Sequence, residues 1–461
     1  MPRGTDSVFA RVALLPSGWA KDVTIEWSAG RISRVDSGQP ALSSSRRCHV
    51  VLPGIPNLHS HAFQRILSGL TEATRSHADS FWSWRELMYK FLGVLDPDSI
   101  EDICAYVFAE MLRAGYTSVA EFHYVHNQAG GQPYNNPAEL SFRVVQAARK
   151  AGIGITHLPV VYERGGFAET ALTALQKRLA CDVDRAVLIA EAISATYRSD
   201  QQVSIGLAPH SLRAVEPGKL GRIATVASKL ARHLPIHIHV SEQVQEVNEC
   251  IAQHQTTPIN LLCDSVQLNS NWCLIHCTHA TEQEFVRIAA ARAVIGLCPT
   301  TEANLGDGTI DLFELMKAGA LFGIGSDSQI SIDPKEEWRI LEYSQRLARR
   351  QRNIAVTAGH SVGRTLFQNS VEAAESVIGR PVGRIATGYV ADLIELKQDD
   401  PALALVDRDE LLDFYIFASN RPAISTVIAA GQTVVVDGRH CNESDLAERY
   451  RRAMERLRSA L

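Results

Sequence analysis

Short apolar runs alternate with amphipathic segments between about residues 53 and 380 of the chain. Eight of these runs are apolar at most positions, which is typical of strands buried on both faces of a sheet. They are GIPNLHSH (54–61), YTSVAEFH (116–123), GIGITHLPVV (152–161), VSIGLAPH (203–210), PIHIHV (235–240), WCLIHC (272–277), AVIGLCP (293–299) and LFGIGSDS (321–328). Eight buried strands separated by helices predict an α/β fold, the parallel (β/α)8 or TIM barrel. An open doubly wound sheet is the alternative, although no GxGxxG motif follows any run.

The segments between the runs carry signals of helix ends. Ile103, Val107 and Met111 recur every four residues between the first and the second run. Ser99 can cap this segment, and Gly115 can end it in a left-handed conformation. We therefore predict a helix between these two residues.

The pattern changes to short alternating strands before residue 53 and after residue 380. DVTIEWSAGRISRVD lies near the start, and GRIATGYVADLIELK and ISTVIAAGQTVVVDGRH lie near the end. We predict that residues 1–52 and 381–461 build one small β-sandwich domain beside the barrel of residues 53–380. A charged helix closes the C-terminal part, and its alternating arginines and acidic residues indicate a solvated face.

Composition narrows the class of protein. Of the 461 residues 46% are hydrophobic and 21% are charged, as in ordinary soluble globular proteins. A net charge of -5 leaves no general basic field for nucleic acid, so no such partner is expected. No segment approaches the roughly 18 apolar residues of a membrane span, so we expect no membrane partner either. The nine scattered cysteines indicate reduced thiols in a cytoplasmic protein.

Five histidines and one aspartate fall where predicted strands end, which is where barrel enzymes place their active sites. These are His59 and His61 on strand one, His210 on strand four, His239 on strand five, His276 on strand six and Asp327 on strand eight. Each alone is more often a hydrogen-bonded core residue than a ligand. Core histidines have no reason to gather at one end of several strands, however, and histidine with carboxylate is a donor set that zinc takes. We therefore predict a metal centre.

Glu242 lies three residues beyond His239, on the turn that leaves strand five. By itself it would be interpreted as a surface partner of the next helix. Beside metal ligands, its carboxylate can take a proton from an activated water and pass that proton to a leaving nitrogen. We therefore predict that Glu242 is a catalytic acid and base.

The motifs PGIPNLHSH, HIHVSEQ, LIHCTH and GIGSDS resemble the metal motifs of the amidohydrolase superfamily, and GRIATGYVADL resembles its closing β segment. The resemblance implies one zinc ion bound by His59, His61, His239 and Asp327. It also implies that Glu242 shuttles protons while His276 and Asp327 orient and activate the attacking water. The fourth strand ends in LAPH without a lysine, which departs from the two-metal branch and fits the one-metal deaminases. Iron or manganese could occupy the same ligands.

Four longer runs, NLHSHAFQRILSGLTE, FWSWRELMY, GYTSVAEFHYVHN and LAPHSLRAV, are similar to the formimidoylglutamate deiminases of histidine degradation. That family hydrolyses N-formimino-L-glutamate to N-formyl-L-glutamate and ammonia, and the resemblance implies a homodimer. It further implies substrate contacts from Gln64, Arg85, Tyr124, His210 and Arg213. Paired arginines independently suit a dicarboxylate substrate, because guanidinium groups bind carboxylates in a bidentate manner. The alternative for each arginine is an ordinary surface ion pair.

Two other functions stay open at this point. A related deaminase acting on a nucleobase or triazine would have less need for two arginines. A noncatalytic scaffold with the same barrel would be expected to lose metal ligands, and here every expected ligand and Glu242 is present.

Three connections after strands are long or unusual. Residues 63–98 and 123–137 exceed ordinary βα loops, so we predict that they form lids. Residues 299–308, PTTEANLGDG, leave strand seven and are expected near the pocket. Sequence reasoning assigns no role to Glu302 or Asn304 within this segment.

Overall fold

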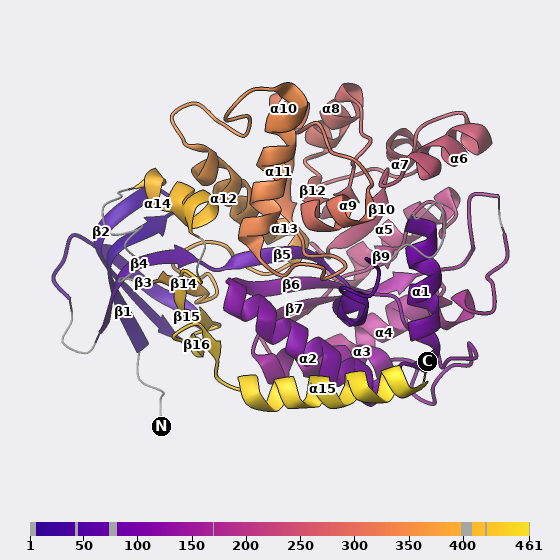
Figure 1. Cartoon of the computed structure of the whole chain (residues 1–461), viewed down its shortest axis with the longest axis horizontal. Coiled ribbons are helices and arrows are strands. Elements are labelled where there is room, and N and C mark those ends of the chain that lie inside the picture. Colours follow the sequence, from indigo (N-terminus) through magenta and orange to yellow (C-terminus); the bar gives the residue numbers. More distant parts are fainter. Residues whose placement is uncertain are drawn as a thin grey trace.

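The protein is described by a computed structural model that covers residues 6–41, 45–72, 81–168, 170–397, 408–419 and 422–460. The predicted barrel is confirmed, with strands that run parallel to one another (Figure 1). In chain order the barrel strands are β5 (Ile55–Ser60), β6 (Tyr116–His123), β7 (Gly154–Val161), β8 (Val203–Ile205) with β9 (Ala208–Pro209), β10 (Ile236–Val240), β11 (Trp272–His276), β12 (Val294–Leu297) and β13 (Leu321–Ile324). Two short pieces, β8 and β9, together form the fourth strand.

The barrel closes through backbone contacts beside its predicted metal ligands. Ser60 of β5 bridges Asp327, which follows β13. The N–H of His61 donates to the carbonyl of Asp327, and the N–H of Asp327 donates to the carbonyl of His59, both at 3.0 Å. The seam between β9 and β10 is likewise made of isolated bridges. A sheet closed at both seams excludes the open doubly wound alternative.

Helices surround the strands. They include α1 (Phe81–Val94), α2 (Pro97–Ala114), α3 (Glu139–Ala151), α4 (Val183–Thr196), α5 (Leu220–Leu230), α6 (Val244–His254), α7 (Pro258–Ser265), α8 (Glu282–Ala291), α9 (Pro299–Leu305), α10 (Leu312–Lys317), α11 (Pro334–Arg349), α12 (Val362–Glu372) and α13 (Ala374–Ile378). Short turns η1 (Ala62–Leu67), η2 (Gln176–Leu179) and η3 (Pro217–Lys219) join them. Among the described residues, no helix combines the length and the apolar character that crossing a bilayer requires.

The start of α2 differs from the prediction. Asp96, and not Ser99, is the N-cap, and its side chain accepts the N–H of Ser99 at 2.7 Å. Pro97 occupies the first helical position, where its fixed φ suits the helix and its missing N–H costs nothing. The predicted end is confirmed, because Gly115 takes a left-handed φ of 100°.

The two chain ends build the predicted small β domain. Its strands are β1 (Asp6–Leu15), β2 (Gly18–Ser28), β3 (Arg31–Ser37), β4 (Arg46–Pro53), β14 (Leu393–Leu396), β15 (Ile424–Ala429), β16 (Gln432–Val436) and β17 (Arg439–His440). They follow the continuous order β17-β16-β15-β14-β4-β1-β2-β3. The contact between β4 and β14 is antiparallel and joins the N-terminal strands to the C-terminal ones. The short helices α14 (Asp409–Asp413) and η4 (Phe414–Ala418) precede β15.

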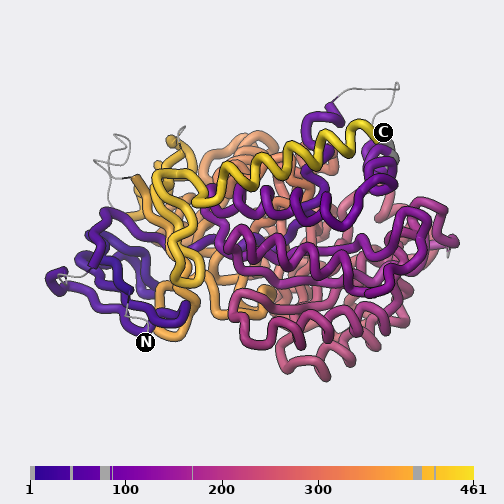
Figure 2. The backbone as a smooth tube through the Cα atoms, turned by 90° about the horizontal axis from the view of Figure 1, so that it is seen from below, coloured from indigo at the N-terminus to yellow at the C-terminus, as the bar shows by residue number. Residues whose placement is uncertain are grey.

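The C-terminal helix α15 (Glu443–Ala460) runs along the barrel helix α2, away from the small sheet (Figures 1 and 2). Leu446, Ala453 and Leu457 form its buried face. Tyr450 stacks on Tyr106 of α2 with ring centroids 4.5 Å apart. The predicted C-terminal part of the small domain therefore divides between the sheet and the outer layer of the barrel. The domain boundaries at residues 52 and 380 stay predictions.

Candidate active site

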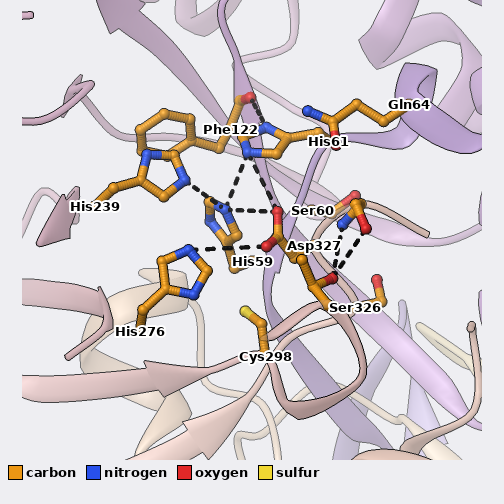
Figure 3. A network of polar contacts seen from close by, with 12 residues as sticks. His59, Ser60, His61, Gln64, Phe122, His239, His276, Cys298, Ser326 and Asp327 are labelled. Carbon is orange, nitrogen blue, oxygen red and sulfur yellow. Dashed lines mark hydrogen bonds and ion pairs between the residues drawn. The ribbon is translucent and has the colours of Figure 1, made fainter. Parts of the chain in front are cut away.

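Four side chains converge at the carboxyl ends of the barrel strands (Figure 3). His59 and His61 come from β5 and the residue after it, His239 from β10, and Asp327 from the turn after β13. His59 Nε2 lies 3.2 Å from His61 Nε2 and 3.0 Å from His239 Nε2. Asp327 Oδ1 lies 3.4 Å from His61 Nε2 and 3.5 Å from His59 Nε2. All four side chains are buried, and one atom from each lies within 4.8 Å of the others.

The hydrogen bonds on the far side of two rings decide which nitrogen faces the cluster as an acceptor. His61 Nδ1 donates to the carbonyl of Phe122 at 2.8 Å, and His239 Nδ1 donates to the carbonyl of His210 at 3.0 Å. A neutral imidazole carries one N–H, so both Nε2 atoms are bare acceptors. These acceptors crowd around His59 Nε2 and the Asp327 carboxylate. Such a donor set fits a divalent cation and is otherwise electrostatically unfavourable.

The pKa values of these groups agree with metal binding. Burial lowers the pKa of His61 to about 3 and also lowers the pKa values of His59 and His239. Burial alone would raise the pKa of Asp327, but the hydrogen bond and charge of His59 and the neighbouring imidazoles hold it below its ordinary value. Neutral imidazoles and an ionised carboxylate are the forms that coordinate metals.

The turn that carries Asp327 is held tightly against β5. Asn57 Nδ2 donates to Ser326 Oγ at 2.7 Å, and Asn57 Oδ1 accepts the Ser326 N–H at 3.1 Å. A Cβ at Gly325 would lie 2.8 Å from the backbone nitrogen of His59, so only glycine permits this close approach. Asp327 itself adopts a φ of 44°, an unusual value for a residue with a side chain.

Glu242 and His276 lie beside the four-residue cluster. Glu242 Oε1 is 3.6 Å from His276 Nε2, and Glu242 Oε2 is 3.5 Å from Arg213 Nη2. His276 Nε2 is 3.8 Å from Asp327 Oδ2. Burial raises the pKa of Glu242, although His276 and Arg213 oppose the change. Burial alone would lower the pKa of His276, but the surrounding carboxylates, Glu242 first, raise it to about 10.

A cavity opens beside these groups, with about 550 Å³ of space free of protein atoms when the open solvent at its mouth is included. All predicted substrate-binding residues line it, namely Gln64, Arg85, Tyr124, His210 and Arg213. Sequence reasoning missed Tyr89 and Tyr162, which also line it, whereas Thr301 belongs to the 299–308 segment that was expected near the pocket. The FWSWRELMY motif carried a signal for Tyr89. Tyr89 lies four residues after Arg85, and residues four apart share one face of a helix.

Arg85 is positioned by two tyrosines. Its Nε donates to the hydroxyl of Tyr89 at 2.7 Å, and its Nη2 donates to the hydroxyl of Tyr162 at 2.9 Å. Gln176 Nε2 lies 3.4 Å from both hydroxyls and links them. A guanidinium group held in this way can present an N–H edge to a carboxylate.

Gln64 and His210 lie closer to the metal cluster. Gln64 Nε2 donates to the hydroxyl of Tyr124 at 2.5 Å, and the Tyr124 ring lies 4.9 Å from the His61 ring. The His210 ring lies 4.9 Å from the His239 ring, and burial holds its pKa well below the ordinary value. His210 therefore packs directly against a ligand ring, and Gln64 contacts one through Tyr124.

The two predicted lids contribute unequally. Residues 63–98 supply much of the cavity wall, including Arg85 and Tyr89 of α1. Among the described residues of 123–137, by contrast, only Tyr124 lines the cavity. The connection after β7 lines it through Tyr162 and Leu179, which sequence reasoning did not expect.

The 299–308 segment separates into two roles. Glu302 of α9 is buried, and its Oε1 lies 3.3 Å from His276 Nδ1. Asn304 points elsewhere and donates to Glu72 Oε1 at 2.8 Å on the surface. No local pattern distinguishes the two residues, so only the tertiary structure assigns Glu302 to the site.

With this fold and this site, the chain belongs to the amidohydrolase family, which it matches over residues 50–434. Residues 5–48 match a second family, described as the formimidoylglutamate deiminase HutF N-terminal domain. Across 446 residues the chain is 43% identical to the formimidoylglutamate deiminase of Pseudomonas aeruginosa, covering 96% of this chain and 98% of that one.

More distant relatives share the architecture. An 8-oxoguanine deaminase of Pseudomonas aeruginosa is 27% identical and covers 85% of this chain and 83% of its own. The crystal structure of an amidohydrolase from Brucella melitensis matches with a TM-score of 0.92 and 40% identity, covering 98% of this chain and 99% of that one. A zinc-containing adenosine deaminase structure from Xanthomonas campestris has a TM-score of 0.81 at 20% identity, with 98% of each chain covered.

Proposed function

We propose that this protein hydrolyses N-formimino-L-glutamate to N-formyl-L-glutamate and ammonia, a reaction of histidine degradation, with one zinc ion per chain. The observation that carries the proposal is that one cavity contains both the groups that would carry out the reaction and the arginines that would bind the substrate carboxylates. Its metal end presents His239, Glu242 and His276, and Arg85 and Arg213 line the same cavity. The identity with the Pseudomonas aeruginosa deiminase over nearly the whole chain supports the same substrate.

Zinc suits the three imidazoles and one carboxylate, because it accepts nitrogen and oxygen ligands and keeps a position for water. When bound, it would supply a water made acidic enough to react near neutral pH. His276, Cys298 and Asp327 form a second possible group. This group shares Asp327 with the first, and the resemblance implies a one-metal site, which supports a single ion.

The acid and base work falls to Glu242. Its carboxylate takes a proton from the attacking water while the water oxygen bonds to the formimino carbon, and the terminal nitrogen gains that proton. A second transfer moves the remaining hydroxyl proton to the same nitrogen, the C–N bond breaks, and ammonia leaves as the formyl C=O forms. His276, 3.6 Å from Glu242, orients the water during the attack.

The two substrate carboxylates pair with Arg85 and Arg213, because bidentate guanidinium contacts favour carboxylates over neutral groups. Gln64, Tyr124 and His210 contact the rest of the substrate. Arg213 lies 3.5 Å from Glu242, so the catalytic carboxylate and one anion-binding group are adjacent.

A substrate panel scored by ammonia release tests the proposal. We expect turnover of N-formimino-L-glutamate, weak turnover of the monocarboxylate N-formiminoglycine, and none of 8-oxoguanine, adenosine or a chlorotriazine. Turnover of a nucleobase or triazine without N-formimino-L-glutamate would replace the proposal with the related deaminase. Zinc, iron and manganese are assayed in the same protein, and absence of all three would favour a noncatalytic scaffold.

We also propose that the protein is a cytoplasmic homodimer. The nine cysteines are all free, which supports a reducing compartment. The family resemblance supports the dimer, and light scattering after size-exclusion chromatography measures it directly. A monomer at micromolar concentration would contradict this part of the proposal.

A further inference from the structure

We infer that Glu302 is a positioning residue for His276, and this inference rests on the proposed hydrolytic function. Glu302 Oε1 accepts from His276 Nδ1 at 3.3 Å. The opposite ring nitrogen, Nε2, lies 3.6 Å from Glu242 and 3.8 Å from Asp327. Figure 3 shows this nitrogen of His276 directed at Asp327, with the other on the far side of the ring. Glu302 thereby holds the ring so that Nε2 faces the water and the proton-carrying Glu242.

The ring of His276 is held differently from the rings of His61 and His239, whereas Nδ1 of His59 has no hydrogen-bond partner among the described residues. His61 and His239 donate from Nδ1 to backbone carbonyls, which the strands place without help from other side chains. Among the described residues, no backbone carbonyl accepts from the His276 ring, and its Nδ1 donates to Glu302 instead. Because a carboxylate at Nδ1 requires an N–H there, Nε2 is left for the reaction whichever charge the ring carries. A reacting base oriented by a third group is a general arrangement in catalysis.

The backbone alone does not determine how His276 points. His276 has a φ of 73° and Cys277 a φ of 53°, so the chain leaves β11 through two left-handed residues. The His276 ring stacks on the His239 ring at 5.5 Å, with an angle of 16° between the planes. Stacking restricts the plane of the ring, but a half-turn about the Cβ–Cγ bond keeps that plane and exchanges Nδ1 with Cδ2 and Nε2 with Cε1. The bond to Glu302 is the contact that opposes this rotation.

Glu302 is itself rigidly placed. It is 4% exposed, and its Oε1 also accepts the N–H of Cys298 at 3.1 Å. Its helix α9 is anchored by Thr300, whose N–H and hydroxyl donate to Glu337 of α11 at 2.9 and 2.6 Å. Among the residues that the structure describes, His276 is the only basic side chain within ion-pair distance of Glu302. We therefore infer that the buried carboxylate of Glu302 orients the His276 ring.

Three variants test the inference, with Asn304→Ala on the same helix as the matched control. We expect Glu302→Gln to lower kcat by about 10- to 100-fold, the usual cost of losing a partner that orients a reacting group. KM should change less than about twofold, and metal content should stay unchanged, because Glu302 touches neither metal ligands nor the cavity. Glu302→Ala should lower kcat further, and Asn304→Ala should leave kcat unchanged. An unchanged kcat in Glu302→Gln would overturn the inference. A variant that loses kcat, bound metal and thermal stability together would also overturn it, because the effect would then be structural.

A measurement that needs no substrate separates this inference from the proposed function. The Nδ1 proton of His276 should give a downfield proton NMR signal, assigned by its loss in His276→Gln. In Glu302→Gln we expect the signal to move upfield or vanish, while in Asn304→Ala it stays. An unmoved signal overturns the positioning role even if N-formimino-L-glutamate is turned over. Failure of that substrate leaves the NMR result standing, and kcat is then measured on whichever substrate of the panel reacts.

Discussion

The metal end and the arginine end of the cavity are built from different parts of the fold. At the metal end, side chains lie at the ends of β5, β10 and β11 and just after β13, all fully buried. At the arginine end, Arg85 and Tyr89 come from α1 and are only partly buried, and Tyr162 follows β7. The metal end is thus built by the barrel strands alone, whereas the arginine end combines the added helix α1 with Arg213, a buried residue that follows β9.

The bonding partners also differ between the two ends. At the metal end, the rings of His61 and His239 donate to backbone carbonyls, and Asn57 fixes the turn that carries Asp327. Arg85 instead depends on the side-chain hydroxyls of Tyr89 and Tyr162. Backbone partners cannot be removed by substitution, whereas side-chain partners can. Changes at the metal end should therefore stop the reaction, and changes at the arginine end should alter substrate affinity.

The largest effect is expected from Asp327→Asn, which removes a ligand charge from the buried cluster. We expect loss of bound metal and a fall in kcat of about 10³-fold or more, because the activated water is lost with it. Wild type should melt at a lower temperature after chelation, since the metal binds only the folded state. Stoichiometric metal retained by the variant in elemental analysis would contradict the ligand assignment.

Glu242→Gln should come next. We expect kcat to fall by about 10²- to 10⁴-fold, the range for losing a general acid and base, with metal content unchanged. Steady-state ammonia release and elemental analysis measure the two quantities. Metal loss together with activity would place Glu242 among the ligands and remove its distinct role.

Arg85→Met tests the contribution of the arginine end to substrate affinity. Losing charge-assisted hydrogen bonds of about 1.5 to 3 kcal/mol should raise KM for N-formimino-L-glutamate by about 10- to 100-fold, with a smaller change in kcat. The matched change Arg213→Met should affect both constants, because Arg213 also lies 3.5 Å from Glu242. A normal KM in both variants would remove the carboxylate-binding argument.

The pH profile of the unmodified enzyme tests the base role of Glu242 at the metal end. Burial raises the pKa of Glu242 above its ordinary value, and the group acts as a base only when ionised. We therefore expect kcat/KM to fall as pH drops through this raised pKa, by about tenfold per pH unit. The residual activity of Glu242→Gln should lack this limb. An acid limb that persists unchanged in the variant would have to belong to another group.

The smallest effect is expected from Tyr162→Phe, which removes one hydrogen bond to Arg85. A net loss of about 1 kcal/mol corresponds to a rise in KM of about fivefold, with kcat unchanged. Tyr343→Phe, at an exposed position on α11, is the matched control. A fall in kcat alone would indicate that Tyr162 acts at the metal end.

Much of this architecture could be predicted because its signals are local. Each buried strand is a run of apolar residues, and each metal ligand lies at or near the end of such a run, so position along the chain already implied position in space. Gln64, Arg85, Tyr124, His210 and Arg213 came from resemblance, since nothing in the spacing of these residues alone would have selected all five. Even the helix start at Asp96 was missed, because two acceptable caps stood three residues apart.

The sequence by itself determined the barrel, the small domain and the metal cluster, because strand alternation sets the direction of His59 and His61 without reference to the rest of the chain. Only the tertiary structure decided which residues support them. Glu302 reaches His276 across 26 residues, and Tyr162 reaches Arg85 across 77. Such contacts depend on how helices and loops dock onto the barrel, and docking is set by the packing of the whole molecule.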